Sequence, residues 1–172
     1  HTNDVLAFRN PDLTIRPALA ESWTYNGDAS VWTFKLRKGV QFKHFENGEI
    51  VNVKEFKAED VIFSINRVFD MESPTAGAVA SEKPTMVAED DYTIRMEFVG
   101  PNATLLEGLV KYHVHMSPSN IDPARFAEET FGTGPYVMTE AIVGERTTFV
   151  RNPDYWMPGQ PYPDELIYLM LP

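Results

Sequence analysis

His113 and His115 are the only two histidines in the sequence that are separated by a single residue. On a β-strand, side chains two residues apart point to the same face, so two imidazoles at this spacing are able to share one metal ion. With a nearby carboxylate they would form the ligand set of a metal-dependent hydrolase. No third ligand stands beside them in the sequence, and two polar side chains on an exposed strand explain the pair more simply. We therefore expect no metal centre.

Paired carboxylates are the other residues that could do chemistry, because two of them suffice for glycoside hydrolysis. They occur at 59–60, 89–91 and 128–129. Each of these clusters falls at a predicted helix start, a turn or a helix surface, where solvated carboxylates are ordinary. The acidic clusters therefore carry no catalytic prediction.

Motifs for nucleotide binding and covalent catalysis are absent from the sequence. There is no Gly-x-x-x-x-Gly-Lys-Ser/Thr and no Gly-x-Ser-x-Gly, and the glycines at 132 and 134 lack the third glycine of a dinucleotide site. The chain has no Cys, which excludes thiolate nucleophiles and iron–sulfur clusters. A Ser–His–Asp set brought together by the fold stays open. We expect a protein that is not an enzyme and has no cofactor.

Composition narrows the classes further. The 172 residues include 15 Lys and Arg against 25 Asp and Glu, which gives a formal net charge of −10. So acidic a chain lacks the positive surface that binds nucleic acid or an anionic membrane. No run of apolar residues approaches the length that a membrane-spanning helix needs, which is about 18 residues. A hydrophobic fraction of 43% is enough for a packed core.

The elements that must position any site have a mixed α+β pattern. Trp32, Phe34 and Leu36 alternate with polar residues, and so do the apolar residues of 92–98, which predicts two half-buried strands that pair. Residues 58–70 place Val61, Ile65 and other apolar side chains on one helical face, which predicts a helix that covers this strand pair.

Weaker patterns predict the remaining elements. We expect a loop with a short turn of helix in 1–22, a turn at 47–48 within a polar stretch over 44–57, and a polar turn at 89–91. Asn102 or Thr104 should cap a short helix over 103–110. We also expect an extended segment at 112–117, a short helix over 122–129, and a hairpin of 136–141 with 146–150 joined at 143–144.

Residues 166–171 are apolar at every position. A strand with one wet face alternates, whereas a strand that is covered on both faces reads as a continuous apolar run. We therefore predict that the chain is cut from a larger fold that covers this strand. The alternative is a strand inserted into the middle of a sheet of this chain.

Four segments form a pattern in this order: 17–23 (PALAESW), 32–42 (WTFKLRKGVQF), 58–67 (AEDVIFSINR), and 132–136 (GTGPY) followed by 151–156 (RNPDYW). Together they resemble the family 5 extracellular solute-binding proteins, which are the dipeptide-, oligopeptide- and nickel-binding receptors of ABC importers. The residues that carry the resemblance are Trp32, Phe34, Leu36, Asp60, Val61, Gly132, Gly134, Pro135, Tyr136, Asn152, Pro153, Tyr155 and Trp156. Two departures stand out: the loop after Phe42 is long for the family, and Lys57 occupies the place of a hydroxyl N-cap.

The resemblance implies a mixed α/β fold that is an N-terminal fragment of a two-lobed, type II periplasmic-binding-protein-like structure with an extra domain. It assigns 1–22 to the first lobe, 23–131 to the extra domain of that lobe, and 132–172 to a return into the first lobe. The second lobe would follow. The glycines at 132 and 134 would stand where the chain crosses between domains and needs a close backbone approach or a positive φ.

The resemblance also implies a function and a site. The protein would capture a small solute, most simply a peptide, by hinge closure and deliver it to a membrane permease, with a nickel chelate or an oligosaccharide as other possible solutes. Its partners would be the permease and ATPase subunits, it would act as a monomer in the periplasm or outside the cell, and a lipid could anchor it. By position, the ligand contacts would be Thr75, Ala76, Gly77, Lys111, Tyr112 and His113.

Overall fold

The structure is a computed structural model that describes residues 1–71 and 76–170. These residues form two compact units. Unit 1 comprises His1–Asn3, Gly39–Phe56 and Asn120–Pro172, and unit 2 comprises Asp4–Lys38 and Lys57–Ser119. The segment 23–131, which the resemblance places in one extra domain, therefore contributes to both units. The assignment of segments to lobes stays a prediction.

Unit 2 is built on a four-stranded antiparallel sheet with the order β3-β4-β8-β7. The strands are β3 (Ala20–Tyr25), β4 (Val31–Leu36), β7 (Thr85–Asp90) and β8 (Thr93–Glu97). The predicted pairing is confirmed, since Trp32 lies opposite Met96 and Phe34 opposite Ile94. These four side chains are buried. The polar turn predicted at 89–91 is wrong in part, because 89 and 90 extend β7.

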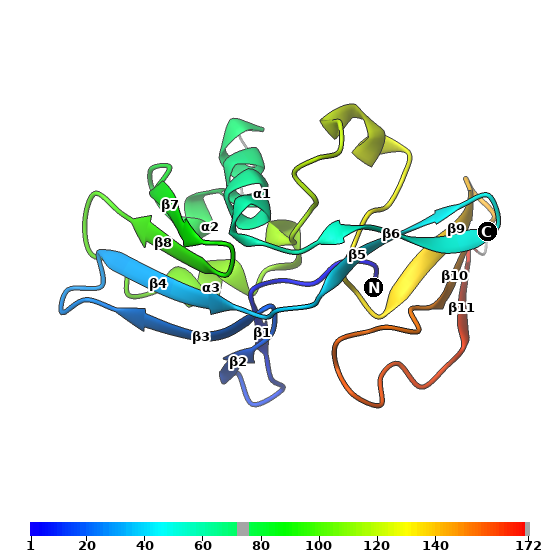
Figure 1. The fold of residues 1–172 in the computed structure, drawn as a ribbon, viewed down its shortest axis with the longest axis horizontal. Helices are drawn as coiled ribbons and strands as arrows, with labels where there is room; N and C mark the ends of the chain where they lie inside the picture. Colours follow the sequence, from blue (N-terminus) through cyan, green and yellow to red (C-terminus); the bar gives the residue numbers. More distant parts are fainter. Residues whose placement is uncertain (72–75, 171–172) are drawn as a thin grey trace. The chain divides into compact units, whose positions relative to one another are not determined.

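Helix α1 (Ala58–Asp70) has the predicted bounds and contacts β7 and β8 (Figure 1). Val61, Ile65 and Val68 are buried on the predicted apolar face. Burying side chains of this size stabilises a fold by roughly 1.5–3 kcal/mol each, before the loss of chain entropy. Lys57 occupies the N-cap position, and its side chain makes no cap hydrogen bond.

The loop with a turn of helix predicted for 1–22 is wrong. The segment forms β1 (Ala7–Arg9), β2 (Ile15–Pro17) and the start of β3. The loops 10–14 and 26–30 share the sequence Asn-x-Asp-x-Ser/Thr and the same network. In each, the Asn amide donates to the hydroxyl, and the hydroxyl and its own backbone N–H donate to the Asp carboxylate. These local bonds favour tight turns, which the apolar patterns do not reveal.

The short helices of unit 2 are α2 (Ala76–Val79), α3 (Leu105–Leu109) and the 3-10 turn η1 (Tyr112–Val114). The helix predicted over 103–110 is confirmed in a shorter form, but its predicted cap is wrong. Thr104 makes no cap hydrogen bond, and the Asn102 side chain donates to the carbonyl of Val79 instead. The extended segment predicted at 112–117 is wrong for 112–114, which form η1.

Unit 1 contains two hairpins. Strands β5 (Gln41–Glu46) and β6 (Glu49–Glu55) are joined at Asn47 and Gly48, whose φ values of 52° and 88° fit a two-residue type I′ turn. The turn was predicted, whereas the two strands beside it were not. The second predicted hairpin is confirmed as β9 (Tyr136–Ile142) and β10 (Arg146–Arg151). The short helix predicted over 122–129 is the 3-10 turn η2 (Pro123–Ala127).

Strand β11 (Glu165–Leu169) lies at the edge of the sheet β11-β10-β9. The alternative that places it in the middle of a sheet is therefore wrong. Among the described residues it pairs with β10 alone, and Ile167, Tyr168, Leu169 and Met170 are between 48% and 64% exposed. The apolar run thus stays uncovered by the part of the chain that the structure describes.

The glycines at 132 and 134 stand where backbones approach closely. A Cβ on Gly132 would overlap the carbonyl oxygen of Thr2, and one on Gly134 would lie 2.6 Å from the carbonyl oxygen of His1. Neither glycine has a positive φ. The predicted requirement for close approach is confirmed, and the need for a left-handed backbone is not.

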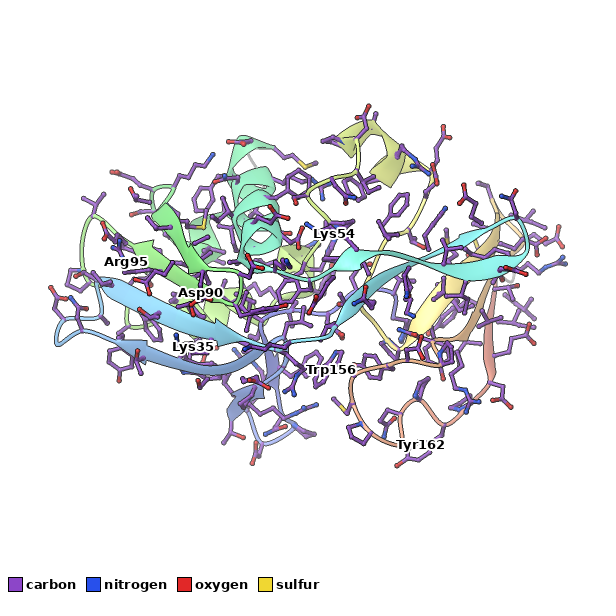
Figure 2. The ribbon with its side chains drawn as sticks, in the orientation of Figure 1. Lys35, Lys54, Asp90, Arg95, Trp156 and Tyr162 are labelled. Carbon is purple, nitrogen blue, oxygen red and sulfur yellow. The ribbon has the colours of Figure 1, made fainter. Side chains whose placement is uncertain are left out.

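The segment 151–156 holds residues 132–134 in place. The Asn152 side chain is buried and donates to the carbonyl of Gly134 at 2.9 Å. Asp154 accepts a hydrogen bond of 2.5 Å from the Nζ of Lys43, a buried lysine that also donates to Asn52. Trp156, labelled in Figure 2, ends the motif. The two parts of the fourth resembling segment, 132–136 and 151–156, therefore meet in one hydrogen-bonded arrangement inside unit 1.

We expect Gly132→Ala to lower the free energy of unfolding by about 1–3 kcal/mol, the usual cost of an overpacked site. Gly100→Ala is the matched control, because a Cβ at Gly100 meets no atom within 4 Å. Urea unfolding of both variants measures the difference. Equal stability of the two variants would contradict the close approach at Gly132.

Candidate functional site

A pocket of about 300 Å³ in unit 2 lies between the C-terminal half of α1 and the turn that follows α3. It contains hydroxyl, imidazole, guanidinium, thioether and aliphatic groups, and no carboxylate among its described lining residues. The lining residues are Ser64, Arg67, Val68, Met71, Tyr112, His113 and His115. Such a pocket offers hydrogen-bond donors beside a small apolar surface.

One side of the pocket is fixed by polar residues on α1. Asp60, Ser64 and Arg67 are spaced four and three residues apart, so they lie on one face of the helix. The Asp60 carboxylate is fully buried and accepts hydrogen bonds from the backbone N–H of Lys57 at 2.9 Å and of Ser119 at 2.8 Å. The first bond gives a partner to a backbone N–H at the start of the helix, where no carbonyl of the helix is available to accept it. The second bond attaches Ser119, which follows the pocket residues in the sequence, to the helix.

Ser64 continues this attachment one turn later. Its hydroxyl oxygen lies 2.6 Å from the carbonyl oxygen of Asp60 and accepts the backbone N–H of Ser117 at 2.8 Å. Arg67 donates to the Ser117 hydroxyl at 3.3 Å. Three side chains of α1 therefore hold 117–119, and this segment in turn positions 112–115.

The opposite side of the pocket is the turn η1. The Tyr112 and His113 rings are 3.7 Å apart between centroids, and Tyr112 is 76% exposed. The Nδ1 of His115 lies 3.0 Å from the carbonyl oxygen of Tyr112, which closes the turn. An exposed aromatic ring that is held by a neighbour is a rigid apolar surface for a ligand.

The pocket favours neutral His115. Burial lowers the pKa of His115, and the charges of Arg67 and His113 lower it further, while the hydrogen bond to Tyr112 opposes them. Burial also lowers the pKa of Arg67. The guanidinium nevertheless stays charged at neutral pH, because an ordinary arginine titrates so far above it. The pocket thus combines one permanent positive charge with imidazole and hydroxyl groups.

The structure distributes the predicted ligand residues over two places. Tyr112 and His113 line this pocket, and Lys111 precedes the turn without lining it. Ala76 and Gly77 lie in α2, where Gly77 lines a separate hollow of about 260 Å³. Thr75 lies outside the described residues. Sequence reasoning missed Ser64 and Arg67 as pocket residues, although their spacing with Asp60 could have indicated a polar helix face.

The strand on which the paired histidines were expected does not exist. Tyr112–Val114 is a 3-10 turn, so the alternation that would place His113 and His115 on one face does not apply. No group of three or more His, Cys, Asp or Glu able to hold a metal ion occurs within 1–71 and 76–170. The premise of the metal-dependent hydrolase is therefore wrong.

A larger open hollow of about 780 Å³ near the end of β4 is a weaker candidate. Lys35 and Asp90, both labelled in Figure 2, line this hollow. The Lys35 Nζ donates to the Thr93 hydroxyl, and this hydroxyl donates to Asp90, both at 2.8 Å. The Tyr92 backbone N–H and the Thr93 hydroxyl lower the pKa of Asp90. These groups already form hydrogen bonds with one another and leave fewer donors and acceptors for a ligand.

Solved structures with this fold define the class. The chain matches the ABC transporter-associated periplasmic binding protein DppA from Helicobacter pylori, solved in complex with the peptide STSA, with a TM-score of 0.83 and 29% sequence identity. The match covers 99% of this chain and 37% of that chain. The fold is that of the type II periplasmic binding proteins.

The chain belongs to the bacterial extracellular solute-binding proteins, family 5, whose model matches residues 14–172. It is 30% identical over 190 residues to Di/tripeptide-binding protein 2 of Pseudomonas aeruginosa and 29% identical over 190 residues to Heme-binding protein A of Haemophilus influenzae. These matches cover 96% and 99% of this chain and 34% of each relative. The chain thus spans about a third of the length of these relatives, and the resemblance seen in the sequence is confirmed.

No helix within the described residues is both long enough and apolar enough to cross a membrane.

His115 should make stability depend on pH. Because its pKa is lower in the folded chain, the unfolded chain binds the proton first as the pH falls below about 6.5. We expect the free energy of unfolding to decrease through the window between about pH 6.5 and the folded pKa. The variant His115→Gln should lose part of this decrease. Urea unfolding at several pH values checks it, and identical pH profiles for the two proteins would contradict the lowered pKa.

Proposed function

We propose that this chain supplies part of a solute-binding receptor of an ABC importer, and that the solute is a peptide. Family membership over 14–172 is the observation that carries the proposal. Two relatives support the solute class, since one is named a di/tripeptide-binding protein and one holds a bound peptide. The receptors of this family are not enzymes, which agrees with the missing catalytic motifs.

The pocket between α1 and η1 suits one end or one carbonyl of a peptide. Arg67 and the imidazoles offer donors to a carboxylate or a backbone carbonyl, and the exposed Tyr112 ring offers an apolar contact. We propose Tyr112 and His113 as the principal contacts in this chain, with Lys111 beside them. Thr75, Ala76 and Gly77 stay proposed contacts on position alone.

Capture would follow from closure of two lobes on the peptide, because contacts from both lobes form together only in the closed state. The partners would be a membrane permease and its ATPase subunits, and ATP would be hydrolysed there. Family 5 relatives are periplasmic, and we propose the same or an extracellular location, with a lipid anchor as one means of retention. The receptor would act as a monomer.

Calorimetric titration with di- and tripeptides tests the proposal. A polypeptide of the length of the relatives that includes these 172 residues should bind peptides, and Tyr112→Ala should weaken binding about tenfold, as truncation of a contact worth more than about 1 kcal/mol does. Tyr162→Ala is the matched control, because Tyr162 is 79% exposed and lies outside the pocket. The 172 residues alone should bind much more weakly, since one lobe provides only some of the contacts.

Two outcomes would contradict parts of this account. Binding of a nickel chelate or an oligosaccharide without binding of peptides would overturn the peptide class and keep the receptor. Equal affinities of the Tyr112→Ala and Tyr162→Ala variants would overturn the pocket as the site.

A further inference from the structure

The sequence contains two Asn-Gly pairs, and the structure treats them differently. Asn26-Gly27 lies in the loop between β3 and β4, and Asn47-Gly48 forms the turn between β5 and β6. Asn-Gly is the most open sequence for reaction of an Asn side chain with the next backbone nitrogen, because glycine has no side chain to hinder the approach. The chemistry is therefore available at two places, and the local structure decides between them.

The Asn26 side chain is held away from its neighbour. Its Nδ2 donates to the Ser30 hydroxyl at 3.0 Å, and its Oδ1 accepts the backbone N–H of Val31 at 3.0 Å. The backbone N–H of Asn26 also donates to the carbonyl of Val31 at 3.0 Å. With both ends of the amide bound across the loop, the side-chain carbonyl carbon cannot turn towards the nitrogen of Gly27 without breaking two hydrogen bonds.

Asn47 has no such restraint. It is exposed at the tip of the β5–β6 hairpin, and its side chain makes no hydrogen bond with another described residue. The residues on either side of the two-residue turn, Glu46 and Glu49, are exposed and lie opposite each other as the last pair of the two strands. Only the two-residue turn itself restricts the approach of the Gly48 nitrogen, and a hairpin tip opens more easily than a packed loop.

We propose that Asn47 is a site of spontaneous deamidation in the folded protein. The backbone nitrogen of Gly48 loses its proton and attacks the side-chain carbonyl carbon of Asn47, so that a new C–N bond closes a five-membered succinimide. The bond from that carbon to Nδ2 breaks, and the nitrogen leaves as ammonia with the proton. Water then opens the ring at either carbonyl, which gives aspartate or isoaspartate. One water is consumed and one ammonia released.

Both products alter the hairpin. Each adds one negative charge to a chain whose formal net charge is already −10, and places it between Glu46 and Glu49. Isoaspartate also lengthens the main chain by one carbon inside a turn that has only two residues. The type I′ geometry that joins the strands cannot accommodate this extra atom without a change of register or fraying.

Peptide mapping by mass spectrometry after incubation of the whole chain at mildly alkaline pH tests the proposal. The extent of deamidation at Asn47 should exceed that at Asn26 by about tenfold or more. This is the factor expected if the reaction at Asn26 must first break two hydrogen bonds. The variant Ser30→Ala removes the acceptor of the Asn26 amide, so conversion at Asn26 should increase while conversion at Asn47 stays the same. In denaturant the two sites should react at similar rates.

The proposal is overturned if Asn26 reacts as fast as Asn47 in the folded chain. It is equally overturned if Asn47 stays intact in the folded chain over a period in which the denatured chain reacts at both sites.

Discussion

The attachment of the chain at 117–119 to helix α1 is the interaction on which the candidate site depends. Asp60, Ser64 and Arg67 lie on one helical face, and each contacts this segment. A buried donor that loses its partner costs about 1–3 kcal/mol, and more when the partner is charged. The buried carboxylate of Asp60 therefore constrains both sides, since the backbone N–H groups of Lys57 and Ser119 depend on it. The pocket exists because this polar face keeps 112–115 beside α1.

Two of the four segments that mark the family hold other parts of this chain in place. In unit 1, Asn152 binds the carbonyl of Gly134, and Asp154 pairs with the buried Lys43. In unit 2, the motif of α1 supplies Asp60 and Ser64. The residues with the clearest family pattern are thus scaffold residues, whereas Tyr112 and His113 lie in a turn without any motif.

The sequence correctly predicted the elements in which the periodic spacing of apolar side chains matches the face that is buried in the structure. The alternation of Trp32, Phe34 and Leu36 led to the correct strand pairing, and the apolar face of α1 led to the correct helix bounds. Both predictions hold because these apolar faces are buried in the core. The pattern failed where local hydrogen bonds decide the backbone. The Asn-x-Asp-x-Ser/Thr loops adjoin β1, β2 and β3, which the sequence did not reveal. The turn η1 bends a segment that was expected to be extended. Ser64 and Arg67 were missed because a polar residue on a helix usually faces solvent, and only the position of 117–119 shows otherwise.

Hydrogen exchange at the backbone amides of Ser117 and Ser119 tests the central claim most directly. If α1 holds this segment, both amides should exchange slowly in the folded protein. Ser64→Ala should then accelerate exchange at Ser117 and in 112–115, while Ser22→Ala, on the exposed side of β3, should leave both unchanged. Fast exchange at Ser117 and Ser119 in the unaltered chain, or no effect of Ser64→Ala on 112–117, would contradict the account.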